Sequence, residues 1–244
     1  MVEAPAKLTL SLRVAGVRSD GYHLIDAEMV TLDLADRLEI RPGDGLEVID
    51  HGAGGPPVGT GDDNLVRRAL AAVGARAQVL LHKWVPAGAG LGGGSADAAA
   101  VLRWAGCDDL AVAALLGADV PFCLRGGRAR VTGAGEAVRP LPLGEVEGMA
   151  YTLLTPPFGV ATAAVYRAWD RLGGPSGPGP NDLEMAALAV EPRLARWRDR
   201  LGDATGEVPV LAGSGGTWFV PGAFPGGERR VVRVCAGLAE GRAR

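Results

Sequence analysis

A strict alternation of apolar and polar residues from Lys7 to Val14 is the first regular pattern in the chain. In an extended conformation the three leucines and Val14 lie on one face, and the other face carries Lys7, Thr9, Ser11 and Arg13. The pattern predicts a half-buried strand that presents Lys7 and Thr9 to solvent. A turn over 19–22 comes next, and an apolar-rich stretch over 23–40 follows it.

Between residues 62 and 124, segments with apolar residues at helical spacing alternate with Gly and Pro residues that end helices. Asp62 or Asp63 is expected to cap a helix that carries an apolar stripe over 65–73 and ends at Gly74. Pro121 is expected to prevent a later helix from continuing. The other predicted elements are a buried strand over 79–81, an alanine-rich helix over 96–105, a helix from Asp109 to Gly117, and an extended segment over 122–124.

The segment 140–148 is the predicted boundary between an N-terminal lobe, residues 1–145, and a C-terminal lobe, residues 146–244. Strands and helices mixed without a strict repeat predict an α+β fold with two lobes. The elements predicted for the second lobe are strands over 150–154, 208–212 and 217–220, helices near 163–171, from 181 and near 192–201, and a last strand or helix over 229–238.

Composition limits the class of protein. Hydrophobic residues make up 48% of the chain and charged residues 22%, so a buried core is expected and wholesale disorder is not. No apolar run reaches the roughly 18 residues of a membrane span, and a net charge of -3 supplies no attraction for nucleic acid. The cysteines lie far apart, which argues against a disulfide framework or a metal cluster. We expect a soluble cytoplasmic protein without a membrane or nucleic-acid partner.

Two residue types are rare enough to direct attention to single positions. Lys7 and Lys83 are the only lysines among the 25 basic residues, and Asn64 and Asn181 are the only asparagines. Codon bias is one explanation of such a depletion. A chain that otherwise uses arginine is nevertheless expected to keep lysine where a compact point charge is needed. These four positions are therefore candidates for functional roles.

A glycine-rich segment joins the strand at 79–81 to the alanine-rich helix. Its G-x-G-x-x-G spacing, from Gly88 to Gly93, occurs in Rossmann dinucleotide sites, but Pro86 and four linker residues interrupt the tight strand-to-helix turn. A Walker A loop is excluded because no lysine precedes Ser95. Bare backbone N–H groups and a helix start near Ser95 predict a polyphosphate site, with a mobile surface loop as the alternative. Ser95 would cap the helix or meet a phosphate-bound Mg²⁺.

Three separated motifs resemble, in the same order, those of the GHMP small-molecule kinases. They are APAKL at 4–8, PAGAGLGGGSA at 86–96 and AGSGGT at 212–217. The resemblance implies a two-lobed fold with a β/α N-terminal lobe and a smaller, ferredoxin-like C-terminal lobe. It implies ATP as a cofactor, with Mg²⁺ bound through its phosphates. The residues implied to bind ATP are Asn64, near the adenine, and Pro86, Ala87, Gly88, Ala89, Gly90, Leu91, Gly92, Gly93, Gly94, Ser95 and Ala96.

Lys7 and Asp119 are the candidate catalytic residues. Phosphoryl transfer to an alcohol requires a positive charge on the migrating group and an acceptor for the hydroxyl proton. By resemblance, Lys7 supplies the charge and Asp119 is the base. Asp119 lies between the helix-ending Gly117 and the pair Val120-Pro121, so short-range constraints hold its carboxylate. Without the resemblance, these two residues would be a solubilising lysine and an aspartate in a turn.

Further short matches point to one branch of the family. DGYH at 20–23, DNL at 63–65 and LGADVP at 116–121 resemble the branch that phosphorylates the 2-hydroxyl of cytidine diphosphate methylerythritol in the non-mevalonate isoprenoid pathway. In that branch a tyrosine stacks on the cytosine and a histidine hydrogen-bonds its edge. Where Thr9 stands, the family usually has asparagine. The residues implied to bind the substrate are Thr9, Tyr22, His23, Thr162, Tyr166, Gly213, Ser214 and Gly215.

The sequence leaves other functions open. One is another GHMP kinase, acting on homoserine, mevalonate or a sugar, although such substrates have no base for Tyr22 and His23 to recognise. Another is a catalytically silent relative that binds nucleotide and acts by protein contact, although Lys7 and Asp119 are both present. A dehydrogenase that uses the G-x-G-x-x-G segment is the most distant. The resemblance implies a monomer or a weak homodimer.

Overall fold

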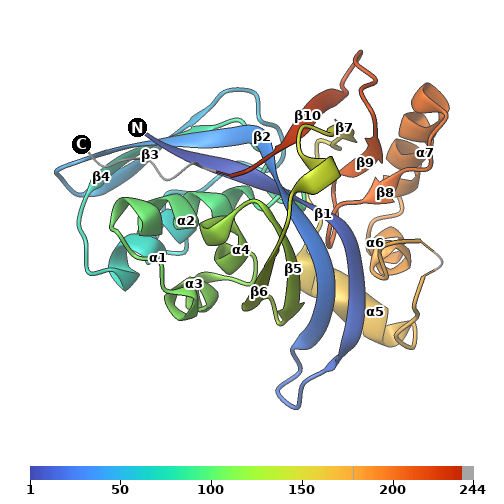
Figure 1. Cartoon of the computed structure of the whole chain (residues 1–244), viewed down its shortest axis with the longest axis horizontal. Coiled ribbons are helices and arrows are strands. Elements are labelled where there is room, and N and C mark those ends of the chain that lie inside the picture. The colour runs from blue at the N-terminus through green and yellow to red at the C-terminus, as the bar shows by residue number, and fades with distance from the viewer. Residues whose placement is uncertain (178, 238–244) are drawn as a thin grey trace.

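The computed structural model describes residues 1–177 and 179–237, whose strands form one ten-stranded sheet (Figure 1). Along its main path the strand order is β3-β4-β2-β10-β7-β9-β8; β1 and β5 also pair with β2, and β6 pairs with β5. The strands are β1 (Val2–Val17), β2 (His23–Arg41), β3 (Gly45–Asp50), β4 (Gln78–Lys83), β5 (Arg128–Gly133), β6 (Ala137–Leu141), β7 (Ala150–Leu154), β8 (Val210–Leu211), β9 (Trp218–Pro221) and β10 (Arg230–Cys235).

The helices lie in two groups against this sheet (Figure 1). The first four in the chain cover the part of the sheet that contains β1, β2 and β4; the fifth lies beside the β1–β2 hairpin, and the last two lie near β8 and β9. They are α1 (Leu65–Ala72), α2 (Gly93–Trp104), α3 (Leu110–Leu116) and α4 (Val120–Arg125), then α5 (Thr162–Arg171), α6 (Glu184–Val190) and α7 (Leu194–Thr205). A 3-10 turn, η1 (Gly144–Val146), lies between β6 and β7. The predicted α+β class is confirmed.

The long β1–β2 hairpin does not have the single apolar face that its sequence predicts. The register of β1 against β2 shifts between Thr9 and Ser11, so a bulge interrupts the alternation. As a result Leu8 and Leu12 are buried in two different core clusters. The prediction that Lys7 and Thr9 face solvent is wrong, because they are only 3% and 1% exposed. Their face of the strand is covered by the loops that precede α2 and β9.

Helix α2 passes through the centre of the first core cluster. Ala98, Ala99 and Ala100 are fully buried, together with Val101 and Leu102. Small side chains let the helix approach the sheet and its neighbouring helices closely. The alanine-rich stretch therefore fixes the position of the helix start, which is where the glycine-rich loop ends.

The chain returns at its end to the first part of the sheet. In β10, Val234 lies opposite Leu32 of β2, and Val232 lies opposite Tyr151 of β7. One strand thus joins the strands of residues 1–141 to those of residues 150–221. The boundary at 140–148 stays a prediction, and the sheet is continuous across it.

Several predicted helix ends differ in the structure. The helix α1 is capped by Asn64, whose side chain accepts a hydrogen bond from Val66 N, rather than by Asp62 or Asp63. The prediction that 122–124 is extended is wrong. Pro121 lies in the first turn of α4, where its missing N–H would have no helical partner and its fixed φ suits the helix. The last element is a strand, and position 238 of that prediction lies outside the described residues.

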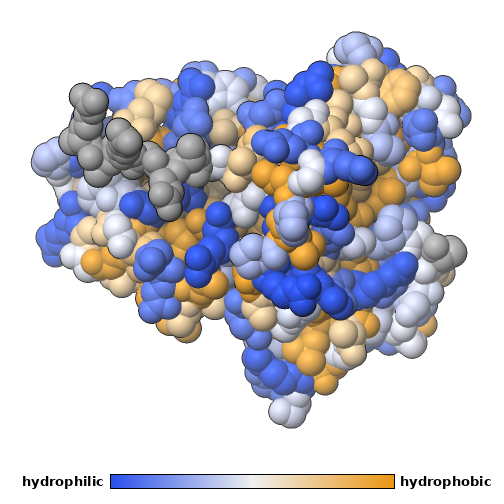
Figure 2. Space-filling model, in the orientation of Figure 1, coloured by the Kyte–Doolittle hydropathy of each residue, from blue (hydrophilic) through white to orange (hydrophobic). Residues whose placement is uncertain are grey.

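No helix among the described residues is long and apolar enough to cross a membrane. In Figure 2, hydrophilic and hydrophobic residues are interspersed over the visible face of the molecule. Cys107, Cys123 and Cys235 are free thiols. In the described part of the chain, no three His, Cys, Asp or Glu residues are grouped so that they could hold a metal ion.

Candidate active site

A cavity of about 950 Å³ lies where the two glycine-rich loops, the β1–β2 turn, α1 and α5 meet. All but two of the predicted site residues line it. The exceptions are Leu91 and Ala96, each 1% exposed, whose side chains are buried in the core. The predicted residues that line the cavity are Lys7, Thr9, Tyr22, His23, Asn64, Pro86, Ala87, Gly88, Ala89, Gly90, Gly92, Gly93, Gly94, Ser95, Asp119, Thr162, Tyr166, Gly213, Ser214 and Gly215.

The first glycine-rich loop ends in an exposed helix start. Helix α2 begins at Gly93, and its N-cap is Gly92 with a φ of 70°, so the alternative in which Ser95 caps the helix is wrong. The backbone N–H groups of the first helical turn have no partner within the helix. Together with the positive end of the helix dipole they form a site for an anionic group. Gly93, Gly94 and Ser95 of this turn line the cavity.

The two glycine-rich loops pack directly against each other. Gly90 has a φ of 79°, and a side chain there would place its Cβ 2.2 Å from the carbonyl oxygen of Ala212. The N–H of Thr217 donates to the carbonyl of Ala89 at 3.0 Å. Buried Asn181 donates to the carbonyls of Leu211 and Gly213 at 2.8 and 2.7 Å. A rare asparagine therefore holds the second loop in position against the first.

Lys7 and Asp119 come from distant parts of the chain and meet in the cavity. The distance from Lys7 Nζ to Asp119 Oδ2 is 3.3 Å. Lys7 also donates to the hydroxyl of Thr9 at 3.0 Å. A Cβ on Gly92 would lie 2.8 Å from Lys7 Cγ, so the lysine stem runs against the N-cap of α2. The ammonium group is thus held beside the carboxylate and the helix start.

Asp119 is positioned by the start of α4. It is the N-cap residue of this helix, and its backbone carbonyl accepts the N–H of Cys123 at 3.0 Å. Its side chain does not cap the helix, and one third of it is exposed to the cavity. Burial, with a contribution from the Asp119 carboxylate, raises the pKa of Cys123 to about 12. The Cys123 thiol therefore stays protonated, and Asp119 is the accessible acidic side chain at this position.

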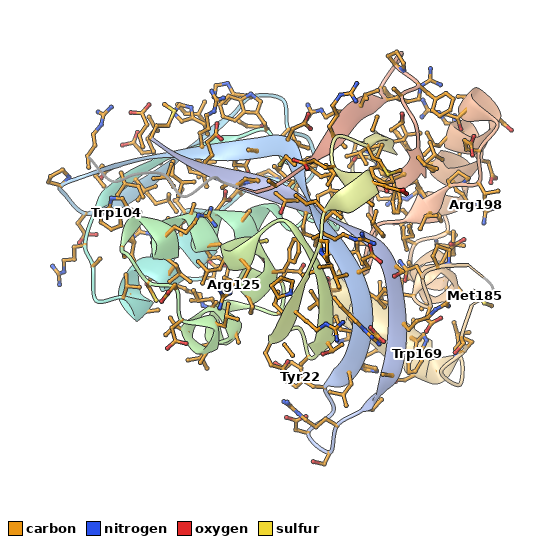
Figure 3. The ribbon with its side chains drawn as sticks, viewed as in Figure 1. Tyr22, Trp104, Arg125, Trp169, Met185 and Arg198 are labelled. Atoms are coloured by element: carbon orange, nitrogen blue, oxygen red, sulfur yellow. The ribbon has the colours of Figure 1, made fainter. Side chains whose placement is uncertain are left out.

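A second group of side chains lies between the β1–β2 turn and α5. Tyr22 follows the turn and is 61% exposed, and Trp169 lies on α5 (both labelled in Figure 3). The rings of His23 and Tyr166 are 4.7 Å apart, and Trp169 meets His23 edge-on at 5.6 Å. Burial and the Asp119 carboxylate raise the pKa of Tyr166, so its hydroxyl stays neutral. The His23, Tyr166 and Trp169 rings, with Tyr22 at the entrance, form what we call the aromatic pocket.

The rest of the predicted site is held by side-chain hydrogen bonds. The hydroxyls of Thr162 and Ser214 lie 2.8 Å apart, which ties the start of α5 to the second glycine-rich loop. Asn64 uses its carbonyl oxygen to cap α1 and donates its amide to the carbonyl of Gly59 at 2.7 Å. The structure therefore brings the predicted residues of both lobes around one cavity.

Among the lining residues that the sequence did not assign to the site are Lys83, Asp97 and Asp170. The rarity of lysine pointed to Lys83 without suggesting a role. Asp170 lies four residues after Tyr166 on α5, and this i, i+4 spacing places both on one helix face. This spacing from Tyr166 was the sequence signal that could have identified Asp170 as a site residue. No sequence signal identified Asp97.

Lys83, Asp36 and Asp97 form a buried charged cluster below the start of α2. Lys83 donates to Asp36, and to Asp97 Oδ2 at 2.7 Å; all three are at most 3% exposed. Asp36 also accepts the N–H groups of Trp84 and Val85. Burial raises the pKa of Asp97 to about 7, because Lys83 lowers it only in part and Asp36 raises it further. Burial alone would lower the pKa of Lys83, but Asp97 and Asp36 raise it overall.

Replacing Lys83 by methionine is expected to destabilise the fold strongly. The change leaves the Asp36 carboxylate buried without its cation, and loss of one partner of a buried ion pair costs about 3–5 kcal/mol. Equilibrium unfolding in urea at pH 7, with wild type as reference, measures this loss. A variant within about 1 kcal/mol of wild type would show that the cluster is not a fixed ion pair.

Asp97→Asn is the companion variant, because it keeps the shape of the side chain and removes its charge and its titration. The folded pKa of Asp97, about 7, lies above the value of about 3.9 for an unfolded aspartate, so the folded state holds the proton more tightly. Its stabilising contribution is full below about pH 4 and is lost as the pH rises through about 7. As the pH rises from about 4 to about 7, the free energy of unfolding of wild type should therefore fall relative to that of Asp97→Asn.

Comparison with known proteins identifies relatives of this chain. A family model described as the GHMP kinases N terminal domain matches residues 64–127. The 4-diphosphocytidyl-2-C-methyl-D-erythritol kinase of Paracoccus denitrificans is 39% identical over 234 residues, which cover 88% of this chain and 84% of that protein. The corresponding enzyme of Pelotomaculum thermopropionicum is 39% identical, covering 88% of this chain and 86% of that protein.

Solved structures show the same relationship. A crystal structure of 4-(cytidine 5'-diphospho)-2C-methyl-D-erythritol kinase superposes with a TM-score of 0.75 at 34% identity, covering 96% of this chain and 99% of that one. The mevalonate kinase of Methanococcus jannaschii superposes with a TM-score of 0.58 at 12% identity, covering 96% and 97%, and shows a shared fold.

Proposed function

The chain belongs to the 4-diphosphocytidyl-2-C-methyl-D-erythritol kinases, a branch of the GHMP kinases, and from this premise we propose which groups carry the reaction. Its activity is transfer of a phosphoryl group from ATP to the 2-hydroxyl of 4-diphosphocytidyl-2-C-methyl-D-erythritol, in the non-mevalonate pathway to isoprenoid precursors. The observation that carries the assignment of groups is the 3.3 Å contact between Lys7 and Asp119 beside the start of α2.

Asp119 acts as the general base. Its carboxylate accepts the proton of the 2-hydroxyl as that oxygen attacks the γ-phosphorus, and the bond from this phosphorus to the β,γ-bridging oxygen breaks to release ADP. Lys7 stabilises the negative charge on the migrating group and holds Asp119 in position. The hydrogen bond to Thr9 fixes the ammonium group of Lys7. Thr9 thus acts on the lysine, in the position where the family usually has asparagine.

The two ends of the cavity suit the two nucleotides. The phosphates of ATP lie along the glycine-rich loop and the start of α2, and the adenine lies on the α1 side, near Asn64 and Leu65. The cytosine lies in the aromatic pocket on the α5 side, between Tyr22 and Tyr166. In Figure 1, α1 lies among the helices of the first group and α5 lies beside the β1–β2 hairpin, so the two nucleotides would occupy different ends of the cavity. One chain supplies all of these groups, which fits a monomer or a weak homodimer.

Mg²⁺ would reach this site bound to the phosphates of ATP. Among residues 1–177 and 179–237, no three acidic, His or Cys side chains are grouped as ligands for a metal ion. The Ser95 hydroxyl in the first turn of α2, which lines the cavity, would contribute to holding the ion. Bound there, Mg²⁺ would supply positive charge for the phosphates.

Release of ADP, measured with three alcohols, tests the proposed function. We expect release with 4-diphosphocytidyl-2-C-methyl-D-erythritol and ATP, and none with homoserine or mevalonate in its place. Release with only one of the latter would assign the chain to another GHMP activity. No release with any alcohol, while ATP still binds, would indicate a catalytically silent relative.

A further inference from the structure

The aromatic pocket contains a carboxylate that the proposed reaction does not use. Asp170 Oδ1 lies 2.7 Å from His23 Nε2. The His23 side chain is only 10% exposed, so the contact restrains a ring that is almost entirely enclosed. An ionised carboxylate has no proton to donate. The proton in this hydrogen bond therefore belongs to Nε2 of His23.

The contact with Asp170 determines whether the other ring nitrogen, Nδ1, donates or accepts a hydrogen bond. In a neutral imidazole only one nitrogen carries a proton, so a proton on Nε2 makes Nδ1 an acceptor. No hydrogen bond joins Nδ1 to any residue in 1–177 or 179–237, and it is not one of the buried polar atoms without a partner. His23 lines the cavity. Nδ1 is therefore an acceptor that is open to a bound ligand.

Asp170 and Tyr166 act on His23 from one helix face. They are four residues apart on α5, and both contact the His23 ring: Tyr166 from one side at 4.7 Å, and Asp170 at the Nε2 edge. The edge-on contact with Trp169 at 5.6 Å encloses the ring further. A half-turn of the imidazole would put Cε1 in the place of Nε2 and lose the hydrogen bond to Asp170, although the ring contacts would remain. The orientation and the protonation of His23 are thus set by the same element.

We propose that Asp170 is a positioning residue that fixes the tautomer of His23 and thereby makes the pocket select cytosine over uracil. The two bases differ at C4, where cytosine carries an amino donor and uracil a carbonyl acceptor. An acceptor at Nδ1 pairs with the amino group and opposes the carbonyl oxygen. The inference rests on the proposed function, because it requires a pyrimidine nucleotide in this pocket.

The test compares two substrates that differ only in the base. Wild type and Asp170→Asn are assayed with the cytidine diphosphate substrate and with its uridine diphosphate counterpart. In Asp170→Asn the amide can donate or accept, so the tautomer is no longer fixed. We expect wild type to prefer the cytidine substrate by about 100-fold in kcat/KM, and the variant to lose about tenfold of this preference, mainly through KM.

Three controls separate this role from a structural one. Asp170→Glu keeps the acceptor and should retain most of the preference. Asp203→Asn makes the same chemical change on the exposed face of α7, away from the cavity, and should leave the preference unchanged. Equal losses with both substrates in Asp170→Asn, or an unchanged ratio, would overturn the inference. Absence of activity with the cytidine substrate in wild type would instead overturn the proposed function.

Nitrogen-15 NMR of the histidine rings gives a second readout that does not depend on activity. The chain has three histidines, so the His23 signals can be assigned from a His23→Gln variant. We expect the wild-type spectrum at pH 7.5 to show a proton on Nε2 and none on Nδ1, and Asp170→Asn to show both tautomers. A proton on Nδ1 of wild type, alone or with Nε2, would contradict the proposal.

Discussion

Replacing Asp119 by asparagine is expected to lower kcat by about 10²–10⁴-fold, the range that general-base catalysis contributes. The amide keeps the size of the side chain and can still accept a hydrogen bond from Lys7, but it cannot take the proton of the attacking hydroxyl. The KM for both substrates should change little, because Asp119 contributes mainly in the transition state. Steady-state assays of ADP release, with ATP and the cytidine substrate varied in turn, measure both constants.

Asp109→Asn is the matched control for this loss. Asp109 is the N-cap of α3, and its side chain accepts the N–H of Ala111. Asparagine caps helices as well as aspartate does, so this variant should keep wild-type activity and stability. If Asp119→Asn also retained near wild-type kcat, Asp119 would not be the base.

Replacing Lys7 by alanine is expected to lower kcat by about 10²–10³-fold, the effect of removing one preorganised group that stabilises developing charge. The ammonium group is held by Asp119 and Thr9, so water entering the space does not reproduce its position. In the proposed function the glycine-rich loop binds phosphates through its backbone, so the dissociation constant for ADP should rise only a fewfold in this variant. Single-turnover kinetics and calorimetric titration with ADP separate these two effects.

Arg139→Ala serves as the control for loss of a cation, because Arg139 lies exposed on β6 and away from the cavity. It should leave turnover unchanged. If Lys7→Ala lost most of its affinity for ADP as well as its kcat, the lysine would act in nucleotide binding rather than on the transferred phosphoryl group. Near wild-type turnover in Lys7→Ala would remove it from the mechanism.

Local patterns predicted elements well where one face of an element meets the core. The apolar run at β7 and the caps of α3 are examples, since Asp109 and Gly117 begin and end that helix as expected. The helix α3 ends before Pro121 as expected, but the prediction that 122–124 is extended was wrong. Pro121 lies in the first turn of a new helix, where its missing N–H has no cost. Only the path of the chain around Asp119 shows whether this proline follows the end of one helix or also begins the next.

The site could be predicted in part. The glycine-rich loop could be identified from its run of bare backbone groups before a helix, whereas Lys7 and Asp119 were identified through the resemblance of their motifs to those of the GHMP kinases. The sequence did not reveal the bulge in β1, which turns Leu8 and Leu12 toward different cores. It also missed Asp170, because pairing with His23 joins residues 147 positions apart. Such contacts depend on how α5 packs beside the β1–β2 hairpin.

The amino-acid sequence by itself determined which candidate groups for phosphate binding and proton transfer this protein has, and most of the segments that form helices and strands. These properties depend on residue type and on neighbours within a few positions. Tertiary structure alone decided that Lys7 is buried beside Asp119, that one lysine serves two buried carboxylates, and that His23 faces Asp170. The physical reason is that charge pairing and tautomer choice depend on distances of a few ångströms, which only the packing of distant segments sets.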